Sequence, residues 1–201
     1  MGRSLKDSKV SLVIPLFNEE GCVRELFKEI STAMDGIDCA NYEVVLVDDC
    51  SRDKTLEVVE ELAANNSAIK CLSLSRNVGH QNALSCGLNA ADGDIIITLD
   101  GDLQHPPALF PEMLRRWEDG ADVVNTIRRN SGSSNLVEKT FSKWFYRIFN
   151  RVAEVSLVPG SADFRLLDRQ CVDALNGMTE HFKFFRGQVP YIGFKQVELL
   201  F

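Results

Sequence analysis

The sequence IIITLDGDLQHPP, residues 95–107, joins an apolar run to an acidic turn. Residues 95–99 are almost entirely aliphatic, which predicts a short strand buried on both faces, as strands of a parallel sheet are. Asp100 and Asp102 follow the end of that strand, and Gln104 adds an amide oxygen at the next alternate position. Hard oxygen ligands that converge on one point are what Mg²⁺ or Mn²⁺ prefers. The stretch therefore predicts a parallel sheet with a metal site at the carboxyl end of a strand, although an Asp-x-Asp pair by itself is also typical of a plain polar turn.

Strands and helices alternate through the first part of the chain. Short apolar runs predict further strands at residues 10–15, 42–47, 69–74 and 122–126. Apolar residues at helical spacing predict helices between the strands, over residues 23–34, 56–62, 83–91 and 108–117. This alternation predicts an α/β domain with a Rossmann-like, mostly parallel sheet and helices on both of its faces. Ligands of such sheets bind beyond the carboxyl ends of the strands, so the acidic turns that follow the second and fourth strands are expected to share one rim.

Composition excludes several classes of function. With 201 residues and 45% hydrophobic content, the chain is long enough for one ordinary globular domain. A net charge of −7 and a pI near 5.0 give no global attraction to nucleic acid, so no nucleic-acid partner is predicted. The six cysteines are scattered without a Cys-x-x-Cys pair, which argues against zinc and against a disulfide scaffold. No signal peptide and no membrane-spanning run is visible, and we expect a chain that is soluble or at most peripheral to a membrane.

An amphipathic helix is predicted over residues 136–153, after the polar loop at 130–135. Its apolar residues follow helical spacing, and a separate basic stripe consists of Lys139, Lys143, Arg147 and Arg151. An aromatic face beside a basic stripe is typical of a helix that lies on an anionic membrane surface. The alternative is that the aromatic face packs on the sheet while the cations form a solvated edge, and both hold if the helix covers the core at the membrane side.

Five motifs carry a resemblance to a known family. They are VIPLFNE at residues 13–19, VDDCSRD at 47–53, RNVGH at 76–80, DGDLQHPP at 100–107 and ADFRL at 162–166. In this order they resemble the family 2 glycosyltransferases with the GT-A fold, and more closely the polyprenyl-phosphate hexosyltransferases. The resemblance covers residues 1–201 as a single GT-A catalytic domain. The acceptor loop and the membrane helices that follow this region in relatives are not part of the sequence.

The resemblance implies a nucleotide-sugar donor, a UDP- or GDP-hexose, at the strand ends. Pro15 and Phe17 would form a wall for the base, and Glu19 would lie near the ribose. Asp49 would accept a hydrogen bond from a ring N–H of the base. Asp53 has a simpler interpretation, because its carboxylate suits the cap of the helix that begins near residue 54.

The resemblance also assigns the acids of the 100–107 motif. Asp100 would reach the ribose and the metal, while Asp102 and Gln104 would hold Mg²⁺ or Mn²⁺ and, through it, the donor diphosphate. The metal would neutralise the charge that builds on the departing nucleoside diphosphate.

Three further residues are candidates for acceptor chemistry. Asp163 matches the acceptor-side carboxylate of relatives, either as a base or as a positioning group, and its alternative is a structural partner for a buried cation. Arg128 and Arg129 follow the predicted strand at 122–126 and would hold the acceptor phosphate or the donor diphosphate, since guanidinium groups suit phosphate. One of this pair is expected to be only a surface charge. Neither His80 nor His105 is assigned a catalytic role.

These observations favour an inverting, metal-dependent transferase that moves a hexose, glucose or mannose, to a polyprenyl phosphate at the cytoplasmic face of the membrane. A second interpretation keeps the fold and donor but takes a hydroxyl of a polysaccharide, protein or soluble glycan as acceptor. A remote third is a receiver-like module without catalysis, suggested only by two acids after a strand. The sequence leaves open whether the chain forms a homo-oligomer.

Overall fold

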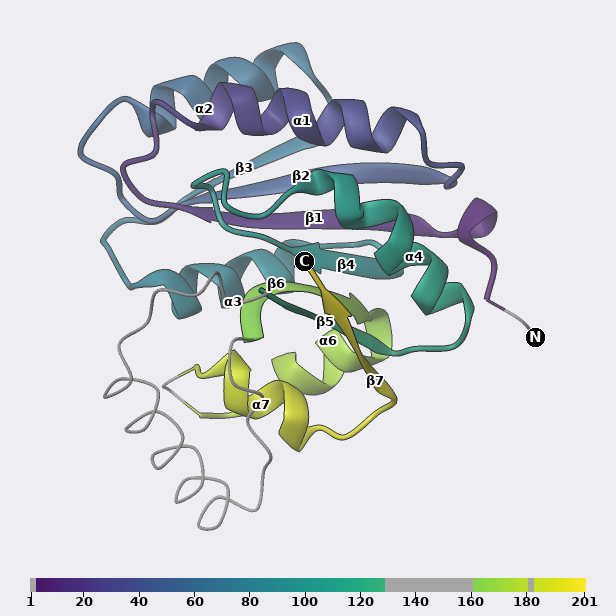
Figure 1. Ribbon diagram of the computed structural model, residues 1–201. Helices are drawn as coiled ribbons and strands as arrows, with labels where there is room; N and C mark the ends of the chain where they lie inside the picture. The colour runs from purple at the N-terminus through teal and green to yellow at the C-terminus, as the bar shows by residue number, and fades with distance from the viewer. Residues whose placement is uncertain (1–2, 129–160, 181–182) are drawn as a thin grey trace, which may run out of the picture.

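The computed structural model describes residues 3–128, 161–180 and 183–201, and within these ranges seven strands form one sheet (Figure 1). The strands lie in the order β3-β2-β1-β4-β6-β5-β7. Their bounds are β1 Lys9–Leu16, β2 Asn41–Asp48, β3 Ile69–Ser73, β4 Ile95–Thr98, β5 Val123–Ile127, β6 Ser161–Asp168 and β7 Gln196–Leu200. The first five are the predicted strands, confirmed to within a residue at each end.

The sheet is mostly parallel, as predicted. β1 pairs in parallel with β2 and with β4, β2 with β3, and β5 with β7. β6 runs antiparallel to both of its neighbours, β4 and β5. The alternating pattern of the sequence does not predict β6 or β7, because both come after the point where that alternation breaks.

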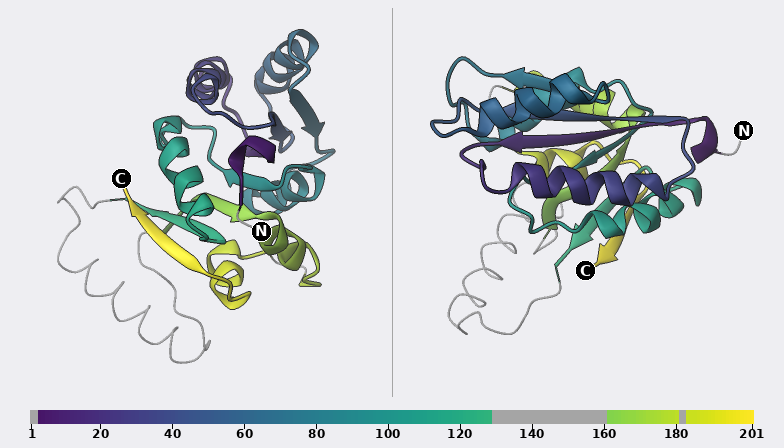
Figure 2. Two further views of the ribbon diagram at one scale, coloured as in Figure 1. Left: turned by 90° about the vertical axis from the view of Figure 1, so that its right-hand side faces the viewer. Right: turned by 90° about the horizontal axis from the view of Figure 1, so that it is seen from above.

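Helices cover both faces of the sheet. One face carries α1 (Val23–Asp35), α2 (Thr55–Asn65) and α4 (Phe110–Glu118), and the other carries α3 (His80–Ala90), α6 (Arg169–Asn176) and α7 (Phe185–Tyr191). Two 3₁₀ turns, η1 (Leu5–Asp7) and η2 (Pro107–Leu109), complete the described elements. The two helical layers and the sheet between them are visible in the end-on view of Figure 2.

The alternation of side chains along β1 explains the two layers. Leu12 and Ile14 point into the core beneath α1 and α4, whereas Val13 points into the core beneath α3. All three side chains are fully buried, because successive residues of a strand face opposite sides of the sheet. A strand that must fill two cores is therefore apolar at nearly every position.

Among the described residues, no helix has the length and apolar character needed to cross a bilayer. The predicted amphipathic helix at 136–153, with its basic stripe, lies outside the residues that the structure describes, as does Arg129.

A buried carboxylate stabilises the amino-terminal edge of the sheet. Glu43 of β2 is 4% exposed, and its Oε1 accepts hydrogen bonds from the Ser11 hydroxyl at 2.6 Å and the Asp92 N–H at 2.7 Å. Its Oε2 lies 3.0 Å from Lys9 Nζ and 2.8 Å from Lys70 Nζ. Burial alone would raise the pKa of Glu43, but the lysines and the hydrogen bonds outweigh it and lower the pKa to about 2.

We expect Glu43→Gln to lower the free energy of unfolding at pH 7 by about 2 kcal/mol. The folded pKa lies below the ordinary value of 4.5, so the carboxylate contributes stability above about pH 4.5 and loses it as the pH falls toward 2. Urea unfolding at several pH values measures this effect. The free energies of unfolding of the wild type and the variant should become equal as the pH falls toward 2. Glu25→Gln, which removes an exposed partner of Lys28, is the control and should change little. A stability difference that is independent of pH would contradict the assignment.

Candidate active site

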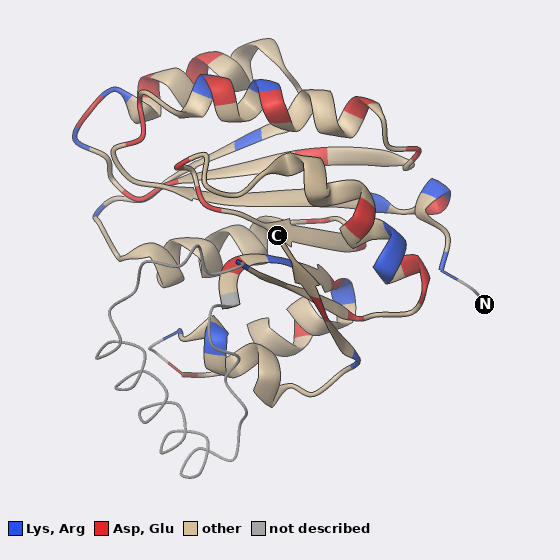
Figure 3. Cartoon of the chain, viewed as in Figure 1, with Lys and Arg blue, Asp and Glu red and all other residues tan. Residues whose placement is uncertain are grey.

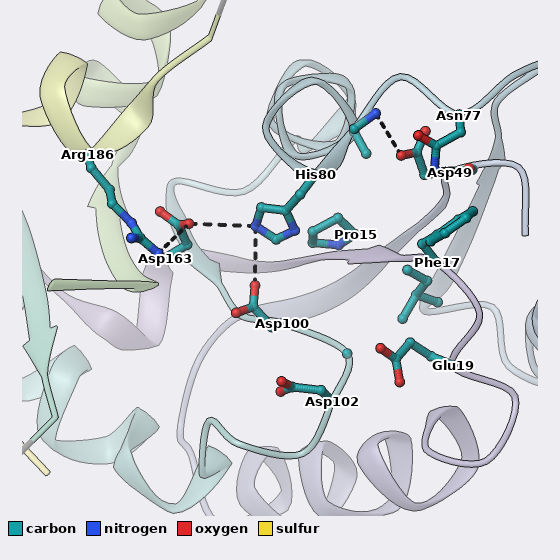
Figure 4. Close-up of a pocket in the computed structure, with 14 residues that line it drawn as sticks. Pro15, Phe17, Glu19, Asp49, Asn77, His80, Asp100, Asp102, Asp163 and Arg186 are labelled. Carbon is teal, nitrogen blue, oxygen red and sulfur yellow. Dashed lines mark hydrogen bonds and ion pairs between the residues drawn. The ribbon is translucent and has the colours of Figure 1, made fainter. Parts of the chain in front are cut away.

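A cavity of about 520 Å³ opens at the carboxyl ends of β1, β2 and β4 (Figure 4). It is lined by Pro15, Leu16, Phe17, Glu19, Asp49, Asn77, Gly79, His80, Ala83, Asp100, Gly101, Asp102, Asp163 and Arg186. Its position confirms the rim expected from the fold, and Figure 3 shows acidic residues in the loops at this end of the sheet. The volume falls in the range of small-molecule and cofactor sites.

One end of the cavity has an aromatic wall. Phe17 is 41% exposed although residues 10–16 before it are buried, and Pro15 lines the cavity between Phe17 and His80 (Figure 4). Asp49 is also at this end, but it is 3% exposed and its two oxygens accept the N–H groups of Val78 at 2.7 Å and Gly79 at 2.9 Å. Asp49 thus fixes the loop that leads into α3, which leaves only its remaining lone pairs for a ligand.

Side chains of the β2–α2 loop hold the β1–α1 loop. Ser51 Oγ accepts the N–H of Asn18 at 3.0 Å, and Thr55 Oγ1 accepts the N–H of Glu19 at 2.8 Å. Asp53 accepts the Thr55 N–H at 3.0 Å, at the start of α2, and the Glu20 N–H at 3.2 Å. Asp53 therefore has the predicted structural role at the start of α2, although the N-cap position itself is Lys54. Glu19 is held with its side chain at the cavity.

The acidic motif begins directly after β4, as the sequence predicts. Asp100 and Asp102 both line the cavity, with Glu19 across from Asp102 in Figure 4. Gly101 lies between them, and a Cβ at this position would come within 2.4 Å of Leu16 Cδ2. The motif therefore lies against the end of β1, and a side chain at position 101 would have to displace the buried Leu16 side chain.

Gln104 and Arg128 are not brought into the cavity. Arg128 donates to Gln104 Oε1 at 3.1 Å and to the Gln104 carbonyl at 3.0 Å, and its guanidinium lies 5.7 Å from the centre of the Phe201 ring. His105 is 5% exposed, stacks on Phe164 with ring centres 5.1 Å apart, and accepts the Asp100 N–H at Nδ1. In the described structure these three residues fix the shape of the acidic loop.

The opposite end of the cavity centres on Asp163. Its Oδ1 lies 3.1 Å from the guanidinium of Arg165, which is 2% exposed. Its Oδ2 accepts a hydrogen bond from Gln81 Nε2 at 3.1 Å and lies 3.4 Å from Arg186 and 3.7 Å from His80 Nε2. The predicted pairing of Asp163 with a buried cation is present, and it coexists with a place in the cavity lining.

This environment makes Asp163 a weak base. Burial alone would raise the pKa of its carboxyl, but the His80 ring and the charges of Arg165 and Arg186 outweigh burial and lower the pKa to about 2. A general base is most effective when its pKa lies near the working pH. Asp163 is therefore suited to hold cations and donors in place rather than to accept a proton.

Two charged or titratable residues of the cavity lining have no role assigned from the sequence: His80, which was considered and left unassigned, and Arg186. His80 Nε2 lies 3.3 Å from Asp100 Oδ1, so its ring links Asp100, which follows β4, to Asp163 of β6 (Figure 4). The interaction with Asp163 outweighs burial and raises the pKa of His80. His80 ends the motif at residues 76–80, whereas Arg186 lies outside all five motifs.

The donor set of the cavity fits a divalent cation that is shared with a substrate. Asp100 Oδ1 is buried, and among the described residues it has no hydrogen-bond partner and only His80 within ion-pair distance. Asp102 adds a second carboxylate in the same lining. The described residues contain no group of three or more acidic, histidine or cysteine side chains arranged around one metal position. Two hard carboxylates suit Mg²⁺ or Mn²⁺, which keeps several positions for water or phosphate.

A family model and several curated relatives agree on the family that this chain resembles. A family model described as glycosyl transferase family 2 matches residues 11–175. An uncharacterized glycosyltransferase of Synechocystis is 36% identical over 96% of this chain and 60% of its own length. A prophage bactoprenol glucosyl transferase homolog of Escherichia coli is 32% identical over 93% of this chain and 61% of its own length. The chain thus spans less than two thirds of the length of these curated relatives.

Solved structures show the same fold. A mannosyltransferase from Pyrobaculum calidifontis, in complex with GDP-Man and Mn²⁺, has a TM-score of 0.66 at 18% identity and covers 96% of this chain and 55% of its own. Staphylococcus aureus TarS 1-349, in complex with UDP-GlcNAc, has a TM-score of 0.63 at 19% identity. The match covers 95% of this chain and 56% of the TarS chain. These neighbours have the GT-A fold, so the predicted fold class is confirmed.

Proposed function

The chain belongs to glycosyl transferase family 2, and on that premise we propose that it transfers a hexose from a nucleotide sugar to a polyprenyl phosphate, with inversion. Relatives named bactoprenol glucosyl transferase, from Shigella phage SfV and Shigella phage SfX, support this acceptor and favour glucose over mannose. Membership of this family argues against the receiver-like module.

The donor would occupy the cavity along its length. Its base would lie against Phe17 and Pro15, where the cavity has its aromatic wall, and Asp49 would accept from the base with a remaining lone pair. Its ribose would lie near Glu19 and Asp100. This placement brings the diphosphate to Asp102 and the sugar toward Asp163.

Asp100 and Asp102 would hold Mg²⁺ or Mn²⁺, and the complex of the Pyrobaculum mannosyltransferase with Mn²⁺ supports divalent metal use in this fold. When bound, the metal neutralises the negative charge that collects on the leaving diphosphate. Gln104, in contrast, would have to release Arg128 before its oxygen could reach the same ion.

The observation that carries the choice of acceptor is the position of Asp163 between two guanidinium groups, with Arg165 3.1 Å from its Oδ1 and Arg186 3.4 Å from its Oδ2. A hydroxyl acceptor needs a base to remove its proton during attack, and a carboxylate with a pKa of about 2 is poorly suited to this. A phosphate monoester has a second pKa near 6 and is already mostly ionised at pH 7. The groups at this end of the cavity therefore fit an acceptor that brings its own negative oxygen.

With a phosphate acceptor, the transfer needs no protein base. An oxygen of the acceptor phosphate forms a bond to the anomeric carbon of the hexose. The bond between that carbon and the donor diphosphate breaks, and its electron pair leaves with the nucleoside diphosphate. His80, Gln81 and Arg165 hold Asp163 at the reacting end while this occurs.

A polyprenyl phosphate is a membrane lipid, so the reaction would take place at a membrane surface. We propose that this is the cytoplasmic face, next to anionic lipid. The basic stripe of residues 139–151 is a sequence-based reason for this placement. Replacing its four cations with Gln is expected to weaken binding to anionic liposomes, since each contributes about 1 kcal/mol near such a surface. Equal binding to neutral and anionic vesicles would contradict it.

A donor panel tests the proposed function. UDP-glucose, UDP-N-acetylglucosamine and GDP-mannose are each incubated with a short polyprenyl phosphate, with and without Mn²⁺, and the glycolipid is measured. We expect transfer from one hexose donor, dependent on the metal. Transfer only to a hydroxyl acceptor would favour the second interpretation and overturn the first.

A further inference from the structure

Arg186 is held at the reacting end of the cavity by an unusually weak pairing. Among the described residues, its guanidinium makes one ion pair, with Asp163 Oδ2 at 3.4 Å, and its side chain is 52% exposed. Asp163 is already paired at 3.1 Å with the buried Arg165, and Oδ2 also accepts from Gln81. Arg186 is thus a second cation on a carboxylate whose charge Arg165 already neutralises.

The helix that carries Arg186 is fixed at its first turn. The N–H of Phe185 donates to Gln81 Oε1 at 3.0 Å, and the carbonyl of Phe185 accepts from Arg165 at 3.5 Å. Phe185 itself is 3% exposed. The backbone beside Arg186 is therefore set in place, while its guanidinium remains exposed at the cavity wall.

Among the described residues, the cations in direct contact with Asp163 outnumber the acids. Arg165 and Arg186 together carry two positive charges, and Asp163 supplies one negative charge in contact with both. Asp100 is the next acid, and it touches His80 rather than either arginine. An anion next to Arg186 would balance the excess, and a guanidinium can offer a phosphate two parallel N–H donors.

We propose that Arg186 is the ligand for the phosphate of the acceptor, and that it leaves Asp163 to bind a phosphate monoester. The choice of an acceptor phosphate, rather than another anion, rests on the proposed function. Arg186 lies beside Asp163, away from the aromatic wall at the base end, which favours the acceptor over the donor diphosphate (Figure 4). Gln81 acts as a positioning residue, because it connects Asp163 to the first turn of α7.

Direct binding tests this assignment without any turnover. A short prenyl phosphate, the corresponding prenol and inorganic phosphate are titrated calorimetrically into the wild type, Arg186→Gln and Arg186→Lys. Arg24→Gln is the matched control, because Arg24 pairs with Glu61 and its side chain is 53% exposed, close to the 52% of Arg186. Each Gln variant removes one guanidinium from one exposed ion pair.

We expect Arg186→Gln to weaken binding of the prenyl phosphate by about 10-fold, the lower range for a charge-assisted hydrogen bond. The affinity of Arg186→Lys should lie between those of the wild type and Arg186→Gln, since lysine keeps the charge and loses the paired donors. The affinity of Arg24→Gln should match that of the wild type. If inorganic phosphate competes with prenyl phosphate, Arg186 binds the phosphate group. If Arg186→Gln still binds prenyl phosphate more tightly than inorganic phosphate, that extra affinity comes from the lipid chain. Equal affinity in the wild type and Arg186→Gln, or no binding by either, would overturn the assignment.

The same variants separate this assignment from the proposed function. If the wild type transfers hexose to polyprenyl phosphate and Arg186→Gln keeps the wild-type KM for that acceptor, the function stands and the assignment of Arg186 fails. If prenyl phosphate binds through Arg186 but no nucleotide sugar is consumed, the binding site stands and the transferase proposal fails. In an active enzyme, the KM for the donor should stay within about 2-fold of the wild type in Arg186→Gln.

Discussion

Asp102→Asn is expected to abolish metal-dependent binding of the nucleotide sugar and to lower turnover by more than about 100-fold, because loss of an outer-shell metal contact already costs about 10- to 100-fold. The substitution removes a charge from the cavity but little else. Asp102 Oδ1 accepts the Gln104 N–H at 3.0 Å, and the amide oxygen of Asn can accept the same bond. The loop should therefore keep its shape while the hard anionic ligand is lost.

Calorimetric titration of the nucleotide sugar with and without Mn²⁺ measures this effect, and thermal unfolding shows whether the fold is intact. Asp119→Asn is the control, since Asp119 is an exposed acid of the same charge that pairs with Arg115 at the end of α4. Wild-type affinity and wild-type metal dependence in Asp102→Asn would remove Asp102 from the proposed metal site.

Asp163→Asn is expected to have two separate effects. It leaves the guanidinium of Arg165, which is 2% exposed, without its counter-charge, and this should lower the free energy of unfolding by about 3 kcal/mol. It should also slow transfer by roughly 10- to 100-fold, because the groups around the reacting atoms lose the carboxylate that all of them contact. Urea unfolding measures the first effect, and kinetics at low temperature measure the second on folded protein.

The pH dependence of the remaining activity distinguishes the two acceptors. With a pKa of about 2, Asp163 is ionised throughout the range from pH 5 to 9, so the wild-type rate should show no titration of this group there. For a phosphate acceptor, Asp163→Asn should add no new pH dependence above about pH 7. For a hydroxyl acceptor, the loss should reach about 10²- to 10⁴-fold, and azide, which needs no deprotonation, should partly restore turnover.

Asp173→Asn on α6 serves as the control, because Asp173 is an exposed partner of Arg169, and it should change neither stability nor rate. Rescue of Asp163→Asn by azide, together with failure to glycosylate any polyprenyl phosphate, would overturn the first interpretation.

The sequence predicts the position of the acids after β4 well and the surroundings of Asp163 poorly. The strand before Asp100 and the turn after it are local patterns, so the sequence places Asp100 and Asp102 at a strand end, and the structure confirms this position. Asp163 was found through its motif, but its strand, β6, was not, since an antiparallel strand inserted between β4 and β5 depends on long-range pairing.

Arg128, Gln104 and Arg186 show why residue type alone is insufficient. A guanidinium after a strand and an amide near two acids both suit the cavity, yet in the structure Arg128 and Gln104 bind each other outside it. Arg186 lies on a short helix without a strong pattern, and it reaches the cavity only because Gln81 and Arg165 fix Phe185. Such placement depends on contacts between segments that are distant in the chain.

The insertion of β6 next to β4, far later in the chain, has a consequence for how the protein is made. Thr98 on β4 donates a hydrogen bond to the carbonyl of Asp163, and the two residues are 65 positions apart. During synthesis, the part of the chain that would bind the donor emerges first, and its neighbour β6 can dock only after this long segment has followed. Until then, the edge of β4 has no strand beside it on that side, and a nascent chain of this length needs protection from wrong pairing at that edge.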